Sequence, residues 1–326
     1  MDNVLISIVD VVNDFKLYVN DKRRKLKLKK VPKEGFINHK IDKLKFKKRQ
    51  EEFNEELSRF AMVLKSNFKK EDLENFRKNM RTLQVYGVYF QLGDFGLHFN
   101  YNTFMGRYDV LKNAVAIDLS KDKEKSSIYH ELFHMASTRR GMILTGSGFH
   151  YHKTDKVSYG RGLNEGYTDL LTQRYFYNKD YEVYYESELI YASLLERIIG
   201  KEKMESLYLN GDLNGLIHEL EKYDTLDNIF HFIKEIDYIK YSDGIPVDTI
   251  RVRSISHFLI QAYMRKKLLN GESIYDNETG KDVYNFIRSV PTTVEVGGNK
   301  IKVDLRDTID MIVNDTFPQE KFEHYR

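Results

Sequence analysis

The sequence predicts an α+β protein, in which a small mixed sheet is followed by a mainly helical C-terminal region. Three observations predict this fold class. Val115, Ile117 and Leu119 alternate with smaller or polar residues, as in a strand. Helical spacing of apolar residues dominates from 163 to about 290. A Gly-Gly-Asn turn at 297–299, between two alternating segments, predicts a hairpin near the C-terminus.

Residues 1–85 are expected to form a basic N-terminal appendage of strand and helix. Residues 21–50 hold fourteen Lys or Arg against three acids, a balance of +11 in a chain whose net charge is only +3. Within this segment, residues 25–29 alternate lysine and leucine and predict an amphipathic strand. Residues 51–66 and 70–84 show helical spacing. The apolar face of the first of these helices comprises Phe53, Leu57, Phe60 and Leu64.

Residues 86–200 form the central part of the chain. Residues 87–97 are rich in glycine and aromatic residues and predict a turn with strands. After the strand at 114–119, a helix is expected to end near Arg139-Arg140-Gly141, where two cations complement the helix dipole and glycine allows a left-handed cap. Five glycines between 141 and 162 predict a long loop or a hairpin.

Residues 201–326 complete the chain as a mainly helical region that carries the terminal hairpin. No stretch of 18 uncharged apolar residues occurs, so we expect no transmembrane segment. The first twenty residues contain Asp2, Asp10 and Asp14 and lack the basic start and small-residue cleavage site of a secretory signal. We therefore expect a cytoplasmic protein.

The chain contains no cysteine. Disulfides, thiolate nucleophiles and cysteine-ligated zinc or iron–sulfur sites are therefore excluded. Any metal ion must be held by His, Asp or Glu.

His130, Glu131 and His134 form a His-Glu-x-x-His motif inside the apolar segment 128–136. Residues four apart share one face of a helix, so both imidazoles can reach one metal ion at about 2.0–2.1 Å. Glu131 lies one step round the helix, where a carboxylate could take a proton from a metal-bound water. Chance would give this motif in roughly one such chain in fifty. Its context therefore matters: a strand precedes it and a second motif follows.

The second motif is Gly-Leu-Asn-Glu-Gly-Tyr-Thr-Asp at 162–169. Zinc held by two histidines needs a third protein ligand, with the fourth position open for water or substrate. Glu165 is the candidate for that ligand. Asp169 follows four residues later on the same helical face, where it could accept a hydrogen bond from the non-coordinating nitrogen of a ligand histidine.

At this point the sequence resembles the gluzincin clan of zinc metallopeptidases, the thermolysin-like group, over roughly residues 105–178. The clan carries His-Glu-x-x-His on one helix and Asn-Glu-x-x-x-Asp on the next, matched here by residues 130–134 and 164–169. The resemblance implies that residues 86–200 form a zincin-like catalytic core of small mixed sheet, active-site helix and glutamate helix. It implies Zn²⁺ as the cofactor. The implied ligands are His130, His134 and Glu165, and Glu131 is implied as general base and acid. Asp169, toward His130, and Asn164 are implied to support the ligands. The longer spacing between the motifs suggests a compact relative.

The implied activity is hydrolysis of a peptide or protein substrate by a zinc-activated water, with Glu131 passing its proton to the leaving amine. The strand around 114–119 resembles the edge strand that pairs with extended substrate in this clan. A donor to the oxyanion is also needed. The sequence leaves five candidates open for that role: His150, His152, Tyr159, His231 and His257.

The basic segment 21–50 supports an alternative from another class. Such segments attract nucleic acid and anionic membrane surfaces. The chain would then be a regulatory protein that binds nucleic acid or an anionic surface through this segment, with a structural or regulatory zinc site. A solvated lysine-rich face is the commoner explanation of such a run.

Overall fold

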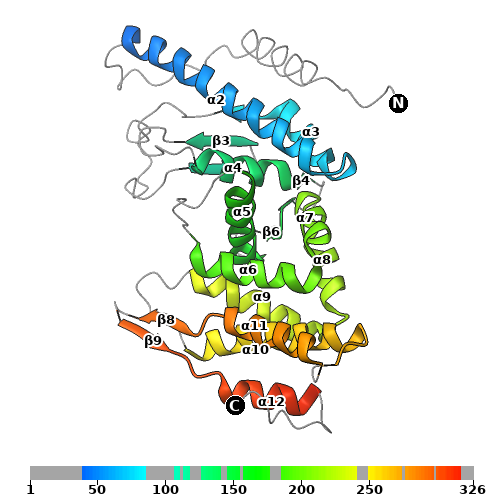
Figure 1. The fold of residues 1–326 in the computed structure, drawn as a ribbon. Coiled ribbons are helices and arrows are strands. Elements are labelled where there is room, and N and C mark those ends of the chain that lie inside the picture. Colours follow the sequence, from blue (N-terminus) through cyan, green and yellow to red (C-terminus); the bar gives the residue numbers. More distant parts are fainter. Residues whose placement is uncertain are drawn as a thin grey trace. The chain divides into compact units, whose positions relative to one another are not determined.

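The computed structural model of the chain describes residues 39–85, 106–110, 113–117, 126–140, 145–154, 157–176, 185–240, 249–273, 276–296 and 299–316. The fold is mixed α+β and mostly helical, with small sheets, as the sequence predicts (Figure 1). The contacts group the chain into two units, the first comprising Met1–Arg139 and Thr172–Tyr181 and the second Arg140–Leu171 and Glu182–Arg326. The division of the chain at residues 85 and 200 stays a prediction.

In the part of the first unit that the structure describes, three α-helices and a short 3₁₀ helix accompany a three-stranded sheet. Its elements are α2 (His39–Asn67), η1 (Glu71–Leu73), α3 (Glu74–Thr82), β1 (Gln84–Val85), β2 (Gly106–Asp109), β3 (Ala114–Ile117) and α4 (Ser126–Ser137). The predicted apolar face of α2 is confirmed, because Phe53, Leu57, Phe60 and Leu64 are all buried. The helix starts at His39, so the last part of the basic segment is helical. The strand predicted at 25–29 and the turn at 87–97 lie outside the described residues.

The sheet of the first unit has the order β1-β3-β2. The strand predicted at 114–119 is confirmed over Ala114–Ile117 as β3, which pairs in parallel with β1 and antiparallel with β2, and residues 118–119 lie outside the described part. The expectation that this strand is the sheet edge is therefore wrong. Both sides of β3 are used by neighbours that local sequence patterns do not reveal. Among the described residues, β1 and β2 are the outer strands of this sheet.

The helix α4 ends earlier than the sequence predicts. Its last residue is Ser137, and Thr138–Arg140 form the strand β4. Arg139 and Arg140 are therefore exposed strand residues, and the expected last turn with two cations is wrong. The reason is a side-chain cap from another helix: Asn79 Nδ2 donates to the carbonyl oxygens of Met135, at 2.8 Å, and Thr138, at 2.7 Å.

The described residues of the glycine-rich segment, 145–154 and 157–162, form antiparallel strand pairs, in keeping with the hairpin that the sequence allowed. Strands β5 (Thr145–Ser147), β6 (His150–Thr154) and β7 (Val157–Tyr159) join β4 in a sheet of order β4-β5-β6-β7. The pairs β5–β6 and β6–β7 are antiparallel. This sheet leads directly into the helix α5 (Arg161–Phe176). The first eleven residues of α5 group with the second unit and its last five with the first.

Helices make up most of the second unit, as the apolar spacing from 163 to 290 predicts. They are α6 (Glu186–Ile199), α7 (Lys201–Leu209), α8 (Leu213–Leu220), α9 (Leu226–Lys240), α10 (Thr249–Leu269), α11 (Asn277–Ser289) and α12 (Arg306–Thr316). The predicted hairpin is confirmed as β8 (Thr293–Val296) and β9 (Asn299–Lys302), with Val296 opposite Asn299. Within the described part of the chain, no helix is both long enough and apolar enough to cross a membrane.

Candidate metal centre

The His-Glu-x-x-His motif lies on α4, a helix that is buried on almost every side. Leu132, Phe133, Met135 and Ala136 have no exposed surface. His130 and His134 are only 7% and 8% exposed, so two polar rings are buried on a helix whose other buried residues are mainly apolar. Buried polar groups of this kind need a hydrogen-bonding or metal partner.

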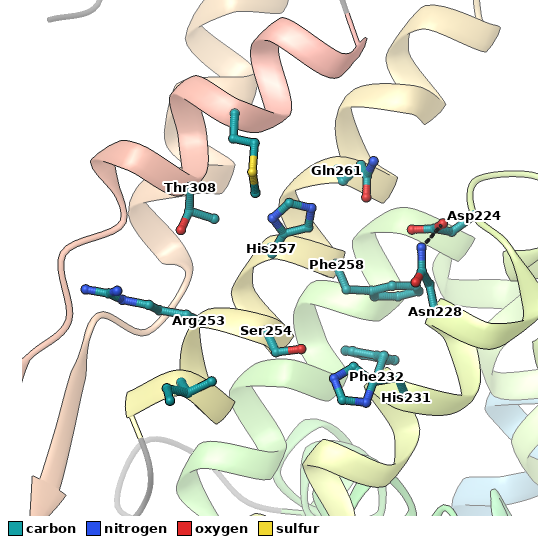
Figure 2. A pocket seen from close by; sticks show the side chains of 12 residues that line it. Asp224, Asn228, His231, Phe232, Arg253, Ser254, His257, Phe258, Gln261 and Thr308 are labelled. Carbon is teal, nitrogen blue, oxygen red and sulfur yellow. Dashed lines mark hydrogen bonds between the residues drawn. The ribbon is translucent and has the colours of Figure 1, made fainter.

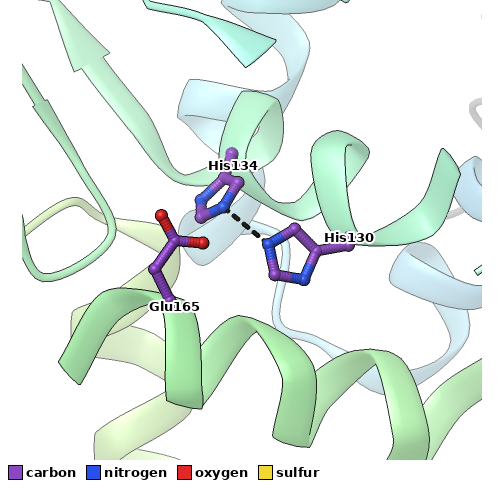
Figure 3. Close-up of side chains that lie close together, drawn as sticks. All are labelled: His130, His134 and Glu165. Carbon is purple, nitrogen blue, oxygen red and sulfur yellow. Dashed lines mark hydrogen bonds between the residues drawn. The ribbon is translucent and has the colours of Figure 1, made fainter. Parts of the chain in front are cut away.

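Figure 3 shows the two imidazoles and the carboxylate of Glu165 pointing toward one another. Each of the three residues offers one ligand atom, and these atoms all lie within 4.8 Å of one another. The Nε2 atoms of His130 and His134 are 3.0 Å apart. Glu165 comes from the first half of α5, and its side chain is 14% exposed. The structure thus brings together the three residues that the sequence singles out as ligands.

The donor set of this group fits a metal ion. Two neutral imidazoles and one carboxylate match the three protein ligands of a catalytic zinc site. Two ligand nitrogens on a tetrahedral zinc ion lie about 3.3 Å apart, close to the 3.0 Å between the two Nε2 atoms. Arg161 Nε lies 3.9 Å from Glu165 Oε1 and adds an ion pair one turn earlier on the same helix.

Glu131 lies against the sheet rather than among the ligands. Its side chain is buried, with 8% exposed, and it packs against Gly106 at the start of β2. A Cβ atom at position 106 would lie 3.0 Å from Glu131 Cγ and 3.2 Å from Glu131 Oε1. The absence of a side chain at this one strand position therefore creates the space in which the Glu131 carboxylate sits.

A buried polar network fixes the end of α4 that follows His134. Asn113 Nδ2 donates to the carbonyl oxygen of Asn79, at 2.7 Å, and Tyr108 donates its hydroxyl hydrogen to Asn113 Oδ1, at 2.9 Å. Asn79 in turn caps α4 through the two bonds described above. Because all three side chains are buried, the network links β2, the turn before β3 and α3 to the motif helix.

The start of α4 is held by Tyr129, the neighbour of His130. Its ring stacks on Phe176 with centroids 4.0 Å apart, and its hydroxyl group donates to the carboxylate of Glu56 on α2. Burial and this hydrogen bond raise the pKa of the Tyr129 phenol, so it remains a hydrogen-bond donor at physiological pH. The motif helix is therefore tied to its surroundings on both sides of the two histidines.

Asn164 and Asp169 are both fully enclosed and both bond to backbone groups. Asn164 Oδ1 accepts a hydrogen bond from Phe149 N, at 3.0 Å, which fixes the turn between β5 and β6. Asp169 Oδ2 accepts from Tyr185 N, at 3.1 Å, immediately before α6. At this point α6 runs very close to α5, because a Cβ atom on Gly166 would lie 2.3 Å from the carbonyl group of Glu188. Contact between Asp169 and the ring of His130 stays a prediction.

Among the histidines that the structure describes, no other one joins this group. The second unit contains a cavity of about 370 Å³. Its lining includes His231 and His257 (Figure 2). Helices α9, α10 and α12 form its walls, and none of its lining residues belongs to the metal-binding group. His150 is on β6 and half-buried, and Tyr159 is 41% exposed on β7. His152 also belongs to β6, but its side chain lies outside the described residues. The oxyanion donor therefore stays unassigned.

Sequence reasoning missed Gly106, Asn79 and Asp237, which hold the site in place. Gly106 and Asn79 act on α4 as described above. Asp237 accepts hydrogen bonds from the backbone at the start of α5. None of the three stands near a motif in the sequence, so only the folded chain reveals them.

We compared the chain with known proteins by sequence and by fold. No protein-family model, curated protein or solved structure matches it.

Proposed function

We propose that this protein is a zinc-dependent metallopeptidase. The observation that carries the proposal is the convergence of His130, His134 and Glu165, beside a buried glutamate that directly follows the first histidine. A group of three nitrogen and oxygen donors is the usual protein part of a catalytic zinc site, which keeps one position open. The absence of cysteine among the donors distinguishes it from most structural zinc sites.

In the proposed reaction, His130, His134 and Glu165 hold the metal ion. A zinc ion in such a site supplies Lewis acidity, polarising a carbonyl group and lowering the pKa of water to about 7. The Glu131 carboxylate accepts the proton of the attacking water. It then gives that proton to the amine nitrogen as the C–N bond breaks and the new C–O bond remains in the acid product. General acid–base catalysis of this kind contributes typically about 10²–10⁴-fold.

The buried position of Glu131 supports this role. A carboxylate packed on Gly106 and shielded from water has few rotamers available, so little ordering is needed before proton transfer. Among the described residues, β2 is an outer strand of the sheet, and it begins at Gly106, directly against Glu131. We infer that β2, rather than β3, lies nearer the bond to be cleaved.

The test combines metal analysis with digestion of a peptide library by the wild type and by Glu131→Gln. We expect about one zinc ion per chain in both proteins. Hydrolysis by the variant should fall by about 10²-fold or more, because the base is lost and the ligands are kept. Glu55→Gln, at an exposed carboxylate on α2, is the matched control and should cleave normally. A wild-type protein that binds no zinc after reconstitution, or that binds zinc and cleaves no peptide, would refute the proposal.

A further inference from the structure

The first turn of α5 is capped by a side chain from a distant helix. Gly160 precedes α5, and its carbonyl oxygen accepts the first helical hydrogen bond, from Asn164 N. A residue in this position normally caps the helix with its own side chain, which glycine lacks. Asp237 on α9 supplies the missing acceptors: its Oδ2 accepts from Gly160 N and its Oδ1 from Gly162 N, both at 2.8 Å.

The backbone of α9 also lies directly against this turn. A Cβ atom on Gly162 would be only 2.6 Å from the carbonyl oxygen of Ile236. The first turn of α5 therefore has no room to move toward α9, and the two hydrogen bonds oppose movement away from it. Both carboxylate oxygens of Asp237 are engaged, so the cap fixes the rotation of the turn as well as its distance.

Glu165 lies three residues beyond Gly162, less than one turn along the same helix. Its carboxylate is one of three groups whose ligand atoms lie within 4.8 Å of one another. Metal–ligand distances tolerate about ±0.2 Å, so a small rotation of the first turn of α5 would remove this ligand. The ionised Asp237 also complements the positive end of the helix dipole.

We propose that Asp237 is a positioning residue for Glu165, which it holds in metal-binding position by capping α5 from α9. The inference rests on the proposed metal site and adds to it a part of the chain that carries no metal-binding motif. It assigns to α9 a role in metal affinity, although no residue of α9 belongs to the ligand group.

The test uses the full chain and two substitutions, Asp237→Asn and Asp237→Ala. Asparagine keeps the shape of the side chain but one of its two ends becomes a donor, so only one backbone bond survives. Zinc affinity is measured by competition with a chelator, and coordination by the visible absorption of the Co²⁺-substituted protein. We expect zinc binding to weaken by about 10- to 100-fold, the usual loss when a group that supports a ligand is removed. The Co²⁺ bands should lose intensity as water replaces the Glu165 carboxylate, more strongly for alanine than for asparagine.

The matched control is Asp212→Asn. Asp212 also caps a helix in the second unit, α8, where its Oδ1 accepts from Gly215 N at 2.9 Å. This variant should lose stability through the same kind of bond, yet keep wild-type zinc affinity and the wild-type Co²⁺ spectrum. The comparison separates positioning of Glu165 from general loss of stability.

The outcomes distinguish this inference from the proposed function. If the wild type binds no metal, the proposed function fails. If the wild type binds zinc and the folded Asp237 variants bind it equally well with an unchanged Co²⁺ spectrum, the positioning role is refuted. Hydrogen exchange in the wild type gives a result that needs no variant: the amides of Gly160 and Gly162 should be protected at pH 7. Unprotected amides there would also overturn the cap.

Discussion

At the scale of single residues, Gly106 determines where the Glu131 carboxylate can lie. Alanine at this position would place its Cβ atom 3.0 Å from Glu131 Cγ and 3.1 Å from Ser127 Cβ. These distances are shorter than ordinary carbon–carbon contact, so the carboxylate must shift. The metal ligands do not contact Gly106 in this way, and their positions should be kept.

We therefore predict that Gly106→Ala lowers kcat for peptide hydrolysis while zinc affinity stays at the wild-type value. Steady-state kinetics together with chelator competition would measure both quantities. Gly146→Ala is the control, since a Cβ atom on this strand glycine of β5 meets nothing closer than 3.4 Å. Equal kcat values for wild type and Gly106→Ala would show that Glu131 has more room than its packing indicates.

Asp237 gives the stability of the protein a definite pH dependence. Burial raises its pKa from 3.8 to about 6, against the opposing effect of the hydrogen bonds from Gly162 and Gly160. The folded protein therefore binds this proton more tightly than the unfolded chain does. The contribution of Asp237 to stability is fully present below about pH 4 and is lost as the pH rises through about 6.

The measurement is the free energy of unfolding of the wild type and of Asp237→Asn, by urea, across that pH range. The difference between wild type and variant should decrease as the pH rises from about 4 to about 6 and then level off. A difference in the free energy of unfolding that stays constant between about pH 4 and about pH 6 would contradict this pH dependence. The ionised carboxylate supplies both acceptors to α5, so the cap is favoured above about pH 6. In that pH range, the contribution of Asp237 to the free energy of unfolding is smallest.

At the scale of helices and strands, the end of α4 depends on the two hydrogen bonds that buried Asn79 donates to it. Asn79→Ala removes both donors to the carbonyl groups of Met135 and Thr138 and leaves them buried. We predict a loss of about 1–3 kcal/mol in the free energy of unfolding, the usual cost of a buried group without its partner. Asn67→Ala removes the same kind of bond from the exposed end of α2, where Asn67 Nδ2 donates to the carbonyl oxygen of Val63, and should change the free energy of unfolding by about 0.5 kcal/mol or less. Denaturant titration measures the free energy of unfolding of both variants. Equal losses would mean that the buried bonds of Asn79 stabilise the fold no more than an exposed bond does.

The elements that the sequence predicts are those whose signal is local. Phe53, Leu57, Phe60 and Leu64 repeat with the period of a helix, and a helix buries them. The Gly-Gly-Asn sequence at 297–299 likewise predicts a hairpin from its own neighbours, and β8 pairs with β9 with Val296 opposite Asn299. The end of α4 could not be predicted, because Asn79, which determines it, stands 56 residues before Met135. The central position of β3 could not be predicted either, because the alternation of its residues indicates a strand but does not indicate the order of strands in the sheet.

At the scale of the whole molecule, metal binding should stabilise the fold. The ligand group joins residues of α4 and α5 that are 31 positions apart, and the unfolded chain does not hold them together. Free zinc at about 100 times its Kd should therefore add about 2.7 kcal/mol to the free energy of unfolding. Thermal unfolding with zinc and with a chelator measures this, and His134→Ala should remove the difference. A zinc-dependent shift that persists in His134→Ala would place the ion elsewhere.

In the candidate site too, the residues predicted from the sequence are those in local motifs, and those that were missed are distant in sequence from the groups they contact. His130, Glu131 and His134 could be predicted because a single helix sets their spacing, and Glu165 because one metal ion needs a third ligand. Asp237 could not, since its carboxylate meets Gly160 and Gly162 only after 75 or more residues of intervening chain have folded. The residues that bind are thus readable in the sequence, and the residues that hold them in place are not.

Gly166 has a consequence for how relatives of this protein can be recognised. The backbone of α6 at Glu188 leaves no space for a methyl group there, so the residue after Glu165 can change only if a neighbouring helix retreats. The same holds for Gly162 against Ile236. A search profile built on Gly-x-x-Glu-Gly, followed by an aspartate three residues later, therefore encodes a helix-packing requirement. Such a profile would find divergent homologues and would reject chance occurrences of a short histidine motif.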